Sequence, residues 1–121
     1  MTAPRIIDGE APVLIIVDHA SNQVPPGVDL GLEAALLDDH IAVDIGTEAL
    51  AVALAAELDA PAVMATVSRL VIDMNRDPDA PGLVPTASDG HVVPGNLALT
   101  KVERELRFSA IHAPYHAAIA A

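Results

Sequence analysis

The sequence contains no cysteine and no tryptophan, and it has one phenylalanine and one tyrosine among 121 residues. Without cysteine the chain can form neither disulfide bonds nor thiolate metal sites. Hydrophobic residues nevertheless make up 52% of the chain, and alanine alone supplies 23 of them. Because large side chains are few, we expect a core packed closely from small aliphatic residues. The length predicts a single domain, residues 1–121.

Basic residues are also scarce. Lysine and arginine total 6 against 17 aspartates and glutamates, which gives a formal charge of −11 and disfavours binding to nucleic acid or anionic membranes. No segment approaches the roughly 20 apolar residues of a membrane span, and the N-terminal residues lack the apolar core of a signal peptide. We therefore expect a soluble, cytoplasmic protein without nucleic-acid or membrane partners.

A continuous apolar run, residues 12–17, precedes a cluster of polar residues. The run predicts a strand buried on both faces, of the kind found in the centre of a parallel sheet. Directly after it come Asp18, His19, Ser21 and Asn22. Because ligands bind at the carboxyl ends of strands in open α/β sheets, these side chains mark a candidate site.

The middle of the chain continues this pattern. Residues 47–58 predict a helix of good helix formers, and residues 62–67 form a second β-like apolar run. The expected apolar stripe of the helix consists of Leu50, Leu54 and Leu58 with Ala51 and Ala55 alongside. A strand, a helix and a second strand in this order satisfy a right-handed parallel crossover. We therefore expect an α/β fold with an open, mostly parallel sheet and flanking helices.

The other segments are predicted from local signals. Residues 1–11 favour a loose lead-in, 32–39 a short helix, 68–76 a short strand, and 77–96 a long irregular loop rich in proline and glycine. A last helix is expected to begin at Thr100, which has the capping-box spacing with Glu103. Its expected buried side consists of Val102, Leu106 and Ala110, and Pro114 should kink or end it.

His19 and Asp44 are candidate metal ligands. Zinc sites without cysteine use histidine and carboxylates, and catalytic ones keep an open position for water. A half-buried histidine that hydrogen-bonds a neighbouring loop is an alternative interpretation of His19. Asp44 stands just before the helix 47–58, where an acidic residue also favours an N-cap role.

Two arginines form the second candidate group. Arg69 and Arg76 flank Asp73 and Asn75, and their planar guanidinium groups suit bidentate recognition of a carboxylate, to which Asn75 adds donors and an acceptor. Structural ion pairing with Asp73 or Asp77 explains the same pattern equally well. Both interpretations stay open on the sequence alone.

The remaining histidines carry weaker signals. His91 lies beside a predicted turn, and His112 and His116 have the four-residue spacing of helical ligands, but Pro114 lies between them and no HExxH glutamate is present. We therefore predict structural roles for them. The absence of a glycine-rich phosphate loop and of a GxSxG elbow counts against nucleotide binding and serine hydrolase chemistry.

Five sequence blocks in one order resemble the N-formylglutamate amidohydrolase family. They are VDHASNQVP, HIAVDIG, SRLVIDMNR, SDG followed by PGN, and APYH, and they span residues 17–116. The resemblance implies an α/β fold akin to the zinc-dependent exopeptidase-like (phosphorylase/hydrolase-like) fold. It also implies hydrolysis of N-formyl-L-glutamate to formate and L-glutamate, a step of histidine degradation.

Carried over by position, the resemblance makes His19 a zinc ligand and Asp44 the candidate second ligand. It makes Arg69, Asn75 and Arg76 the clamp for the carboxylates of a small anionic formylated or acylated amino acid. Zinc would supply an activated water, because it lowers the pKa of bound water to about 7. One departure is Asn22, which stands where the exopeptidase-like pattern has a carboxylate.

Family members are about twice as long as this chain, which therefore resembles the N-terminal half of such an enzyme, a truncated form of its fold. We expect the general base in the second half. Two alternatives to a hydrolase remain open, namely a catalytically silent remnant and a small-molecule binding module without catalysis.

Overall fold

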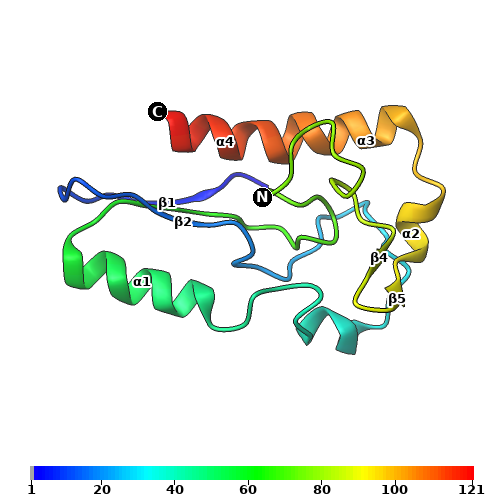
Figure 1. Cartoon of the computed structure of the whole chain (residues 1–121), viewed down its shortest axis with the longest axis horizontal. Coiled ribbons are helices and arrows are strands. Elements are labelled where there is room, and N and C mark those ends of the chain that lie inside the picture. Colours follow the sequence, from blue (N-terminus) through cyan, green and yellow to red (C-terminus); the bar gives the residue numbers. More distant parts are fainter. Residues whose placement is uncertain (1) are drawn as a thin grey trace.

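The chain forms three layers. The computed structural model describes residues 2–121. In Figure 1, α3 (Lys101–Arg107) and α4 (Ala113–Ala120) form one layer, α1 (Thr47–Leu58) forms another, and the strands run between them. The expected α/β class is therefore confirmed.

The sheet has three short strands in the order β1-β3-β2. They are β1 (Arg5–Ile7), β2 (Ile15–Val17) and β3 (Ala62–Met64). β3 pairs parallel with β2 and antiparallel with β1. The sheet is thus mixed rather than mostly parallel, because residues 5–7, which we expected to belong to a loose lead-in, form a strand.

The expectation of a central, doubly buried strand fits β3 and is wrong for β2. All three residues of β3 are buried. β2 lies at the edge of the sheet, and Ile16 is 46% exposed. An apolar run has the same composition in a central strand and in an edge strand that lacks a neighbour, so the sequence pattern could not distinguish them.

The predicted helix 47–58 is confirmed, but only the alanine part of its predicted apolar stripe is buried. α1 begins after Gly46, whose φ of +85 suits glycine. Of the predicted stripe, Ala51 and Ala55 face the sheet as expected, whereas Leu50, Leu54 and Leu58 are exposed. Small alanine side chains allow the helix to approach the strands closely, and this places the larger leucines on the outer side.

The C-terminal helices also bury an unexpected face. The Thr100–Glu103 capping box is confirmed, but Val102 and Leu106 are exposed, and Arg107 is buried instead. The Arg107 guanidinium donates to the carbonyl oxygen of Val71 at 2.9 Å, and burial lowers the pKa of this group. α3 is therefore held by a buried cation.

Pro114 does not end the helix. A π-helical turn, Phe108–His112, connects α3 to α4, and Pro114 lies in the first turn of α4. Proline has no N–H for the carbonyl four residues earlier, and the wider turn just before it accommodates this loss. Tyr115 and Ile111 then face the core.

The segments around the site are irregular. Residues 68–76 form turns, so the predicted short strand is wrong. Residues 77–96 include the hairpin of β4 (Ala87–Ser88) and β5 (His91–Val92) and part of α2 (Pro94–Leu97). The expected short helix at 32–39 is a 3₁₀ helix, Ala34–Asp38.

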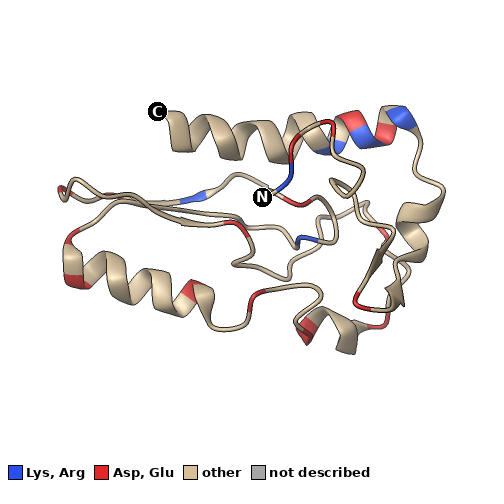
Figure 2. Ribbon diagram, in the orientation of Figure 1, with Lys and Arg blue, Asp and Glu red and all other residues tan. Residues whose placement is uncertain are grey.

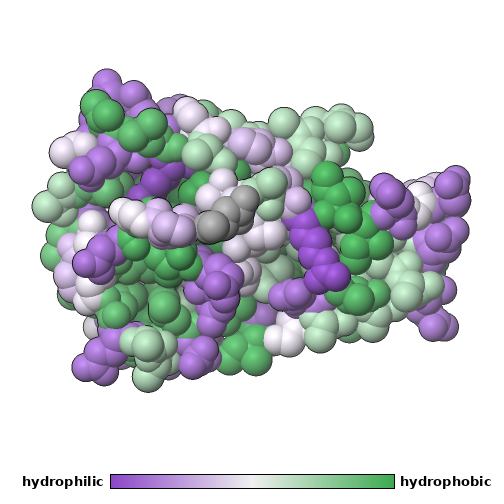
Figure 3. Space-filling view, turned by 180° about the vertical axis from the view of Figure 1, so that it is seen from behind, coloured by the Kyte–Doolittle hydropathy of each residue, from purple (hydrophilic) through white to green (hydrophobic). Residues whose placement is uncertain are grey.

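The charges and hydrophobic residues at the surface are unevenly distributed. Figure 2 shows acidic residues along α1 and the loops, basic residues concentrated in α3, and no charge on α4. Seen from behind, hydrophobic side chains remain exposed between hydrophilic ones (Figure 3). Within residues 2–121, no helix combines the length and apolar character needed to traverse a bilayer.

Candidate functional site

The site forms where β2 and β3 end. Because the two strands are parallel, their carboxyl ends meet at one edge of the sheet. His19 follows β2 by two residues and is buried. The backbone N–H of Asp44 donates to the His19 carbonyl at 2.9 Å, which fixes the two segments against each other.

The His19 imidazole lies between two carboxylates. Its Nδ1 is 3.2 Å from Oδ2 of Asp44, and its Nε2 is 2.6 Å from Oδ1 of Asp73. Arg69 Nη1 lies 3.2 Å from the other Asp44 oxygen, and Arg76 Nε lies 3.6 Å from the other Asp73 oxygen. We call this series, Arg69–Asp44–His19–Asp73–Arg76, the His19 network. It connects both predicted arginines to the predicted histidine.

The network stabilises the charged forms of its buried members. The hydrogen bond with Asp73 raises the pKa of His19 above its ordinary value, against the opposing effect of burial. Burial favours the neutral form of Asp73, but hydrogen bonds from His19 and from the Asn75 backbone N–H outweigh it and lower the pKa of Asp73. Each member of the pair therefore favours the charged form of the other.

Several alternatives from the sequence are decided by these contacts. The N-cap interpretation of Asp44 is wrong, because Gly46 occupies the N-cap of α1 and the Asp44 side chain reaches His19 and Arg69 instead. The ion-pairing interpretation is confirmed for Arg76, which pairs with Asp73. Arg69 pairs with Asp44, a partner that the sequence did not suggest.

The three predicted clamp residues divide between two cavities. Arg69 and Arg76 line one of about 350 Å³, together with Asp73 and the hydroxyl-bearing residues Thr86 and Ser88. Asn75 instead lines a cavity of about 380 Å³ that also contains Asp18, His19 and Asp44. The two arginines therefore share a pocket, and Asn75 faces the histidine side.

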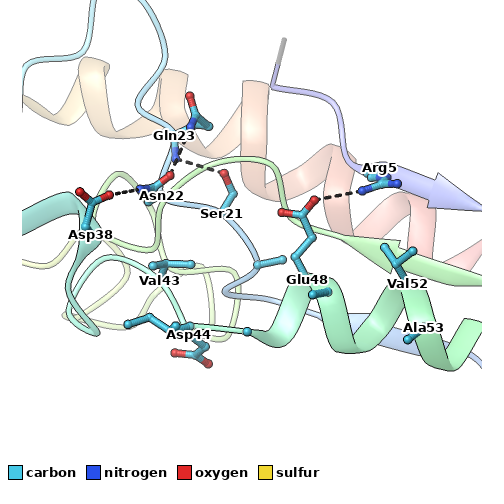
Figure 4. Close-up of a pocket in the computed structure, with 14 residues that line it drawn as sticks. Arg5, Ser21, Asn22, Gln23, Asp38, Val43, Asp44, Glu48, Val52 and Ala53 are labelled. Atoms are coloured by element: carbon cyan, nitrogen blue, oxygen red, sulfur yellow. Dashed lines mark hydrogen bonds and ion pairs between the residues drawn. The ribbon is translucent and has the colours of Figure 1, made fainter.

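A larger groove of about 790 Å³ lies on the other side of Asp44. Figure 4 shows that several of its polar side chains pair with one another, whereas Asp44 makes no contact with them. Arg5 binds Glu48 at 3.0 Å, and the Asn22 amide donates to Asp38 at 3.2 Å and to the Leu37 carbonyl at 3.0 Å. Asn22 thus braces a loop in this structure.

Sequence reasoning underestimated Asp73. We considered it only as an ion-pair partner, although its position between two arginines in SRLVIDMNR was a signal for a site residue. It also missed the hydrogen bond of 2.6 Å that the Tyr115 hydroxyl donates to Asp18, next to His19. Burial and this bond raise the pKa of Tyr115, so the phenol stays protonated.

The structural role predicted for His112 and His116 agrees with the contacts of both residues. Nε2 of His112 lies 2.9 Å from the Arg76 carbonyl oxygen, and Nε2 of His116 lies 2.8 Å from that of Met74. Each ring nitrogen donates to the backbone of the segment that carries Asp73 and Arg76. The two histidines therefore hold one side of the site in place.

Within residues 2–121, the donors around His19 do not by themselves form a group of three metal ligands. A catalytic zinc takes three protein ligands and a water. His19 and the two aspartates have suitable donor chemistry, but both ring nitrogens contact carboxylates. No group of three histidine, aspartate or glutamate side chains among residues 2–121 is arranged to hold a metal ion. A zinc ion on His19 would need ligands from outside these residues.

Fold and site together define a mixed α/β protein that gathers a histidine, two aspartates and two arginines at the carboxyl edge of its sheet. A family model, N-formylglutamate amidohydrolase, matches residues 11–121. The chain belongs to the N-formylglutamate amidohydrolase family, and the resemblance read from the five blocks is confirmed.

A solved structure supports the same relationship. The crystal structure of a gene product from Agrobacterium tumefaciens is similar to this chain with a TM-score of 0.93 and 36% sequence identity. The match covers 98% of this chain and 48% of that one, so the chain spans about half the length of the solved relative. Among curated proteins, no match is found.

Proposed function

We propose that this chain forms the substrate-binding and histidine-bearing half of an enzyme that hydrolyses N-formyl-L-glutamate to formate and L-glutamate, as in cytoplasmic histidine degradation. The observation that carries the proposal is the His19 network, in which the family's histidine and both arginines converge through two aspartates. Membership of the family supplies the reaction type.

The arginine pocket supports an anionic substrate. N-formylglutamate carries two carboxylates, and a guanidinium group binds a carboxylate through two parallel hydrogen bonds. Each arginine makes its ion pair through one nitrogen, Nη1 in Arg69 and Nε in Arg76, which leaves the other guanidinium nitrogens for a ligand. In a protein of charge −11, this pocket is a local basic site.

The arginines and His19 line two different cavities, but Asp73 lines the arginine cavity and also contacts His19. We propose that a substrate held at the arginines extends past Asp73, so that its formyl group approaches His19. Fixing the substrate in this way converts a bimolecular attack into an oriented one. Asp44 and Asp73 contact the two ring nitrogens of His19 and fix the plane of the ring. We propose that the general base comes from the half of the family fold that this chain does not match. His19 and Asp44 remain the proposed zinc ligands within this chain, and no step above depends on the metal.

Calorimetric titration with N-formyl-L-glutamate tests the pocket. Loss of one guanidinium in Arg76→Ala should remove about 1.5–3 kcal/mol of binding, a weakening of about ten- to a hundredfold. Lys101→Ala is the matched control, because it removes an exposed cation from α3 without touching the pocket. Equal affinities of the Arg76 and Lys101 variants would contradict the proposal.

Binding without catalysis is the second candidate function. It is favoured by the absence of a three-ligand metal group in the part of the chain that the structure describes. A formate-release assay on the purified chain separates the two functions, since a binding module would retain the arginine-dependent affinity and release no formate. If the chain neither binds N-formyl-L-glutamate nor releases formate, the result would favour the catalytically silent remnant.

A further inference from the structure

The outer edge of β2 has unpaired backbone groups. The Ile15 N–H donates to the Pro61 carbonyl, and the Ala65 N–H donates to the Val17 carbonyl, so both ends of β2 are bonded to β3. Because backbone groups alternate in direction along a strand, the N–H and C=O of Ile16 point the opposite way. Among residues 2–121, no strand lies on that side. Such an edge readily accepts another strand.

Apolar side chains accompany this edge. Leu50 is 59% exposed, Leu54 40% and Leu58 52%, and they form one row along α1. A groove of about 380 Å³ runs between this row and β2, and Ile15 and Ile16 line it together with Leu50 and Leu54. A free strand edge beside an exposed leucine row is typical of a surface that binds a strand and its flanking apolar residues. We call this surface the β2–α1 groove.

The groove leads to the His19 network. Asp18, His19, Asp44 and Asn75 line the same cavity as the apolar residues. A polypeptide bound along β2 would therefore place its own side chains beside His19. Residues 2–121 contain no group of three side chains arranged to hold a metal ion, so side chains brought to His19 by a bound polypeptide could add the missing ligands.

We propose that the β2–α1 groove binds a strand-and-helix segment equivalent to the part of the solved relative that this chain does not match. The strand adds to the Ile16 edge, its helix packs on the leucine row, and its polar end completes the site at His19. The proposal goes beyond the function proposed above, because it concerns assembly and is tested without substrate.

The unmatched part of the solved relative fits the groove better than a second copy of this chain. The relative shares this fold with a TM-score of 0.93, and only 48% of its length is matched, so it has a further part of about the same length as this chain. A second copy would bring a further charge of −11. The groove contains Asp18 and Asp44 and no lysine or arginine, so identical copies would oppose acidic groups there.

Co-expression tests the proposal. The 121-residue chain and the unmatched part of the Agrobacterium protein are produced as separate polypeptides in one cell, and the purified mixture is analysed by sedimentation. We expect a one-to-one complex and slower amide hydrogen exchange at Ile16 in it. The double variant Leu50→Glu, Leu54→Glu should weaken association at least about tenfold.

The matched control is Val102→Glu, Leu106→Glu, which alters an equally exposed apolar row on α3. Because all four positions are exposed, both variants should keep the circular dichroism spectrum of the parent chain. Absence of a complex, or a complex disrupted by the α3 variant and not by the α1 variant, would overturn the proposal. Self-association of the chain that the α1 variant abolishes would overturn it too, because the occupant would then be a second copy.

Discussion

Fifteen buried residues form one cluster that includes Ile111 and Tyr115 from the α3–α4 layer, whereas beneath α1 a separate cluster contains only Ala20, Ala51 and Met64. Both regions use helices with repeating apolar residues. In the first, turns and loops after β3 add large side chains to the core. In the second, α1 contributes alanines, and its leucines remain outside. The comparison teaches that an apolar repeat identifies a helix but does not identify the side on which it will be covered.

The largest expected effect is a difference in unfolding free energy between two leucine variants, one from each region. Leu70→Ala, in the large cluster and 1% exposed, should lower the free energy of unfolding by about 2–5 kcal/mol because it leaves a cavity. Leu54→Ala on α1 should change it by no more than about 0.5 kcal/mol. Urea unfolding of the two variants measures the difference, and equal losses would remove the distinction between the two regions.

The second effect concerns the His19 network, which joins the regions. Asp73→Asn should cost about 1–3 kcal/mol of unfolding free energy, because a buried hydrogen-bonding group of His19 loses its charged partner. Asp89→Asn, at an exposed partner of His40, is the control and should stay within about 0.5 kcal/mol. Should the Asp89 variant be the less stable of the two, the network would not be a structural centre.

A smaller effect is expected at the helix starts. α3 has a complete capping box, and α1 has no side-chain cap. Thr100→Ala should therefore destabilise the protein by about 1 kcal/mol in thermal or urea unfolding. Glu103→Gln preserves the reciprocal contact and should cost only a few tenths of that loss. A neutral Thr100 variant would show that α3 depends on packing alone.

The most gradual effect is on pH dependence. The raised pKa of His19 gives stability that is fully present below its ordinary value of 6.5 and is lost as the pH rises through the raised value. The lowered pKa of Asp73 gives stability that is present above its ordinary value of 3.8 and is lost as the pH falls through the lowered value. The His19–Asp73 pair should therefore stabilise the folded protein most between pH 3.8 and pH 6.5.

Urea midpoints across this range and above it measure the effect. His19→Gln should flatten the decline on the alkaline side, whereas His91→Gln, at an exposed hairpin position, should leave it unchanged. A decline that persists in the His19 variant would assign the pH dependence to other groups.

Local signals predicted the elements well where they acted within a few residues. The helix 47–58 and the Thr100–Glu103 box depend on nearby side chains and backbone groups, and both are confirmed. The Asp89–Gly90 turn, with positive φ at both residues, also follows from local chemistry. Each of these features can be read without knowing the rest of the fold.

Tertiary placement could not be read in the same way. β1 is a strand because β3 offers it an antiparallel edge, and residues 68–76 form turns despite their apolar content because the chain must wrap around the site. His19, Asp44, Arg69 and Arg76 were predicted as site residues, but the pairing that joins them passes through Asp73, whose role depends on a contact across 54 residues. The sequence therefore suggested the members of the site and not their connections.

The π-helical turn Phe108–His112 acts as a one-residue offset in the C-terminal helix. A single added residue rotates everything beyond it by about 100° relative to an uninterrupted α-helix. That rotation brings two rings of α4 into register with distant groups, so that Tyr115 meets Asp18 and His116 meets the Met74 carbonyl. The π turn thus sets how α4, at the C-terminal end of the sequence, aligns with the segment of Asp18 near the N-terminal end.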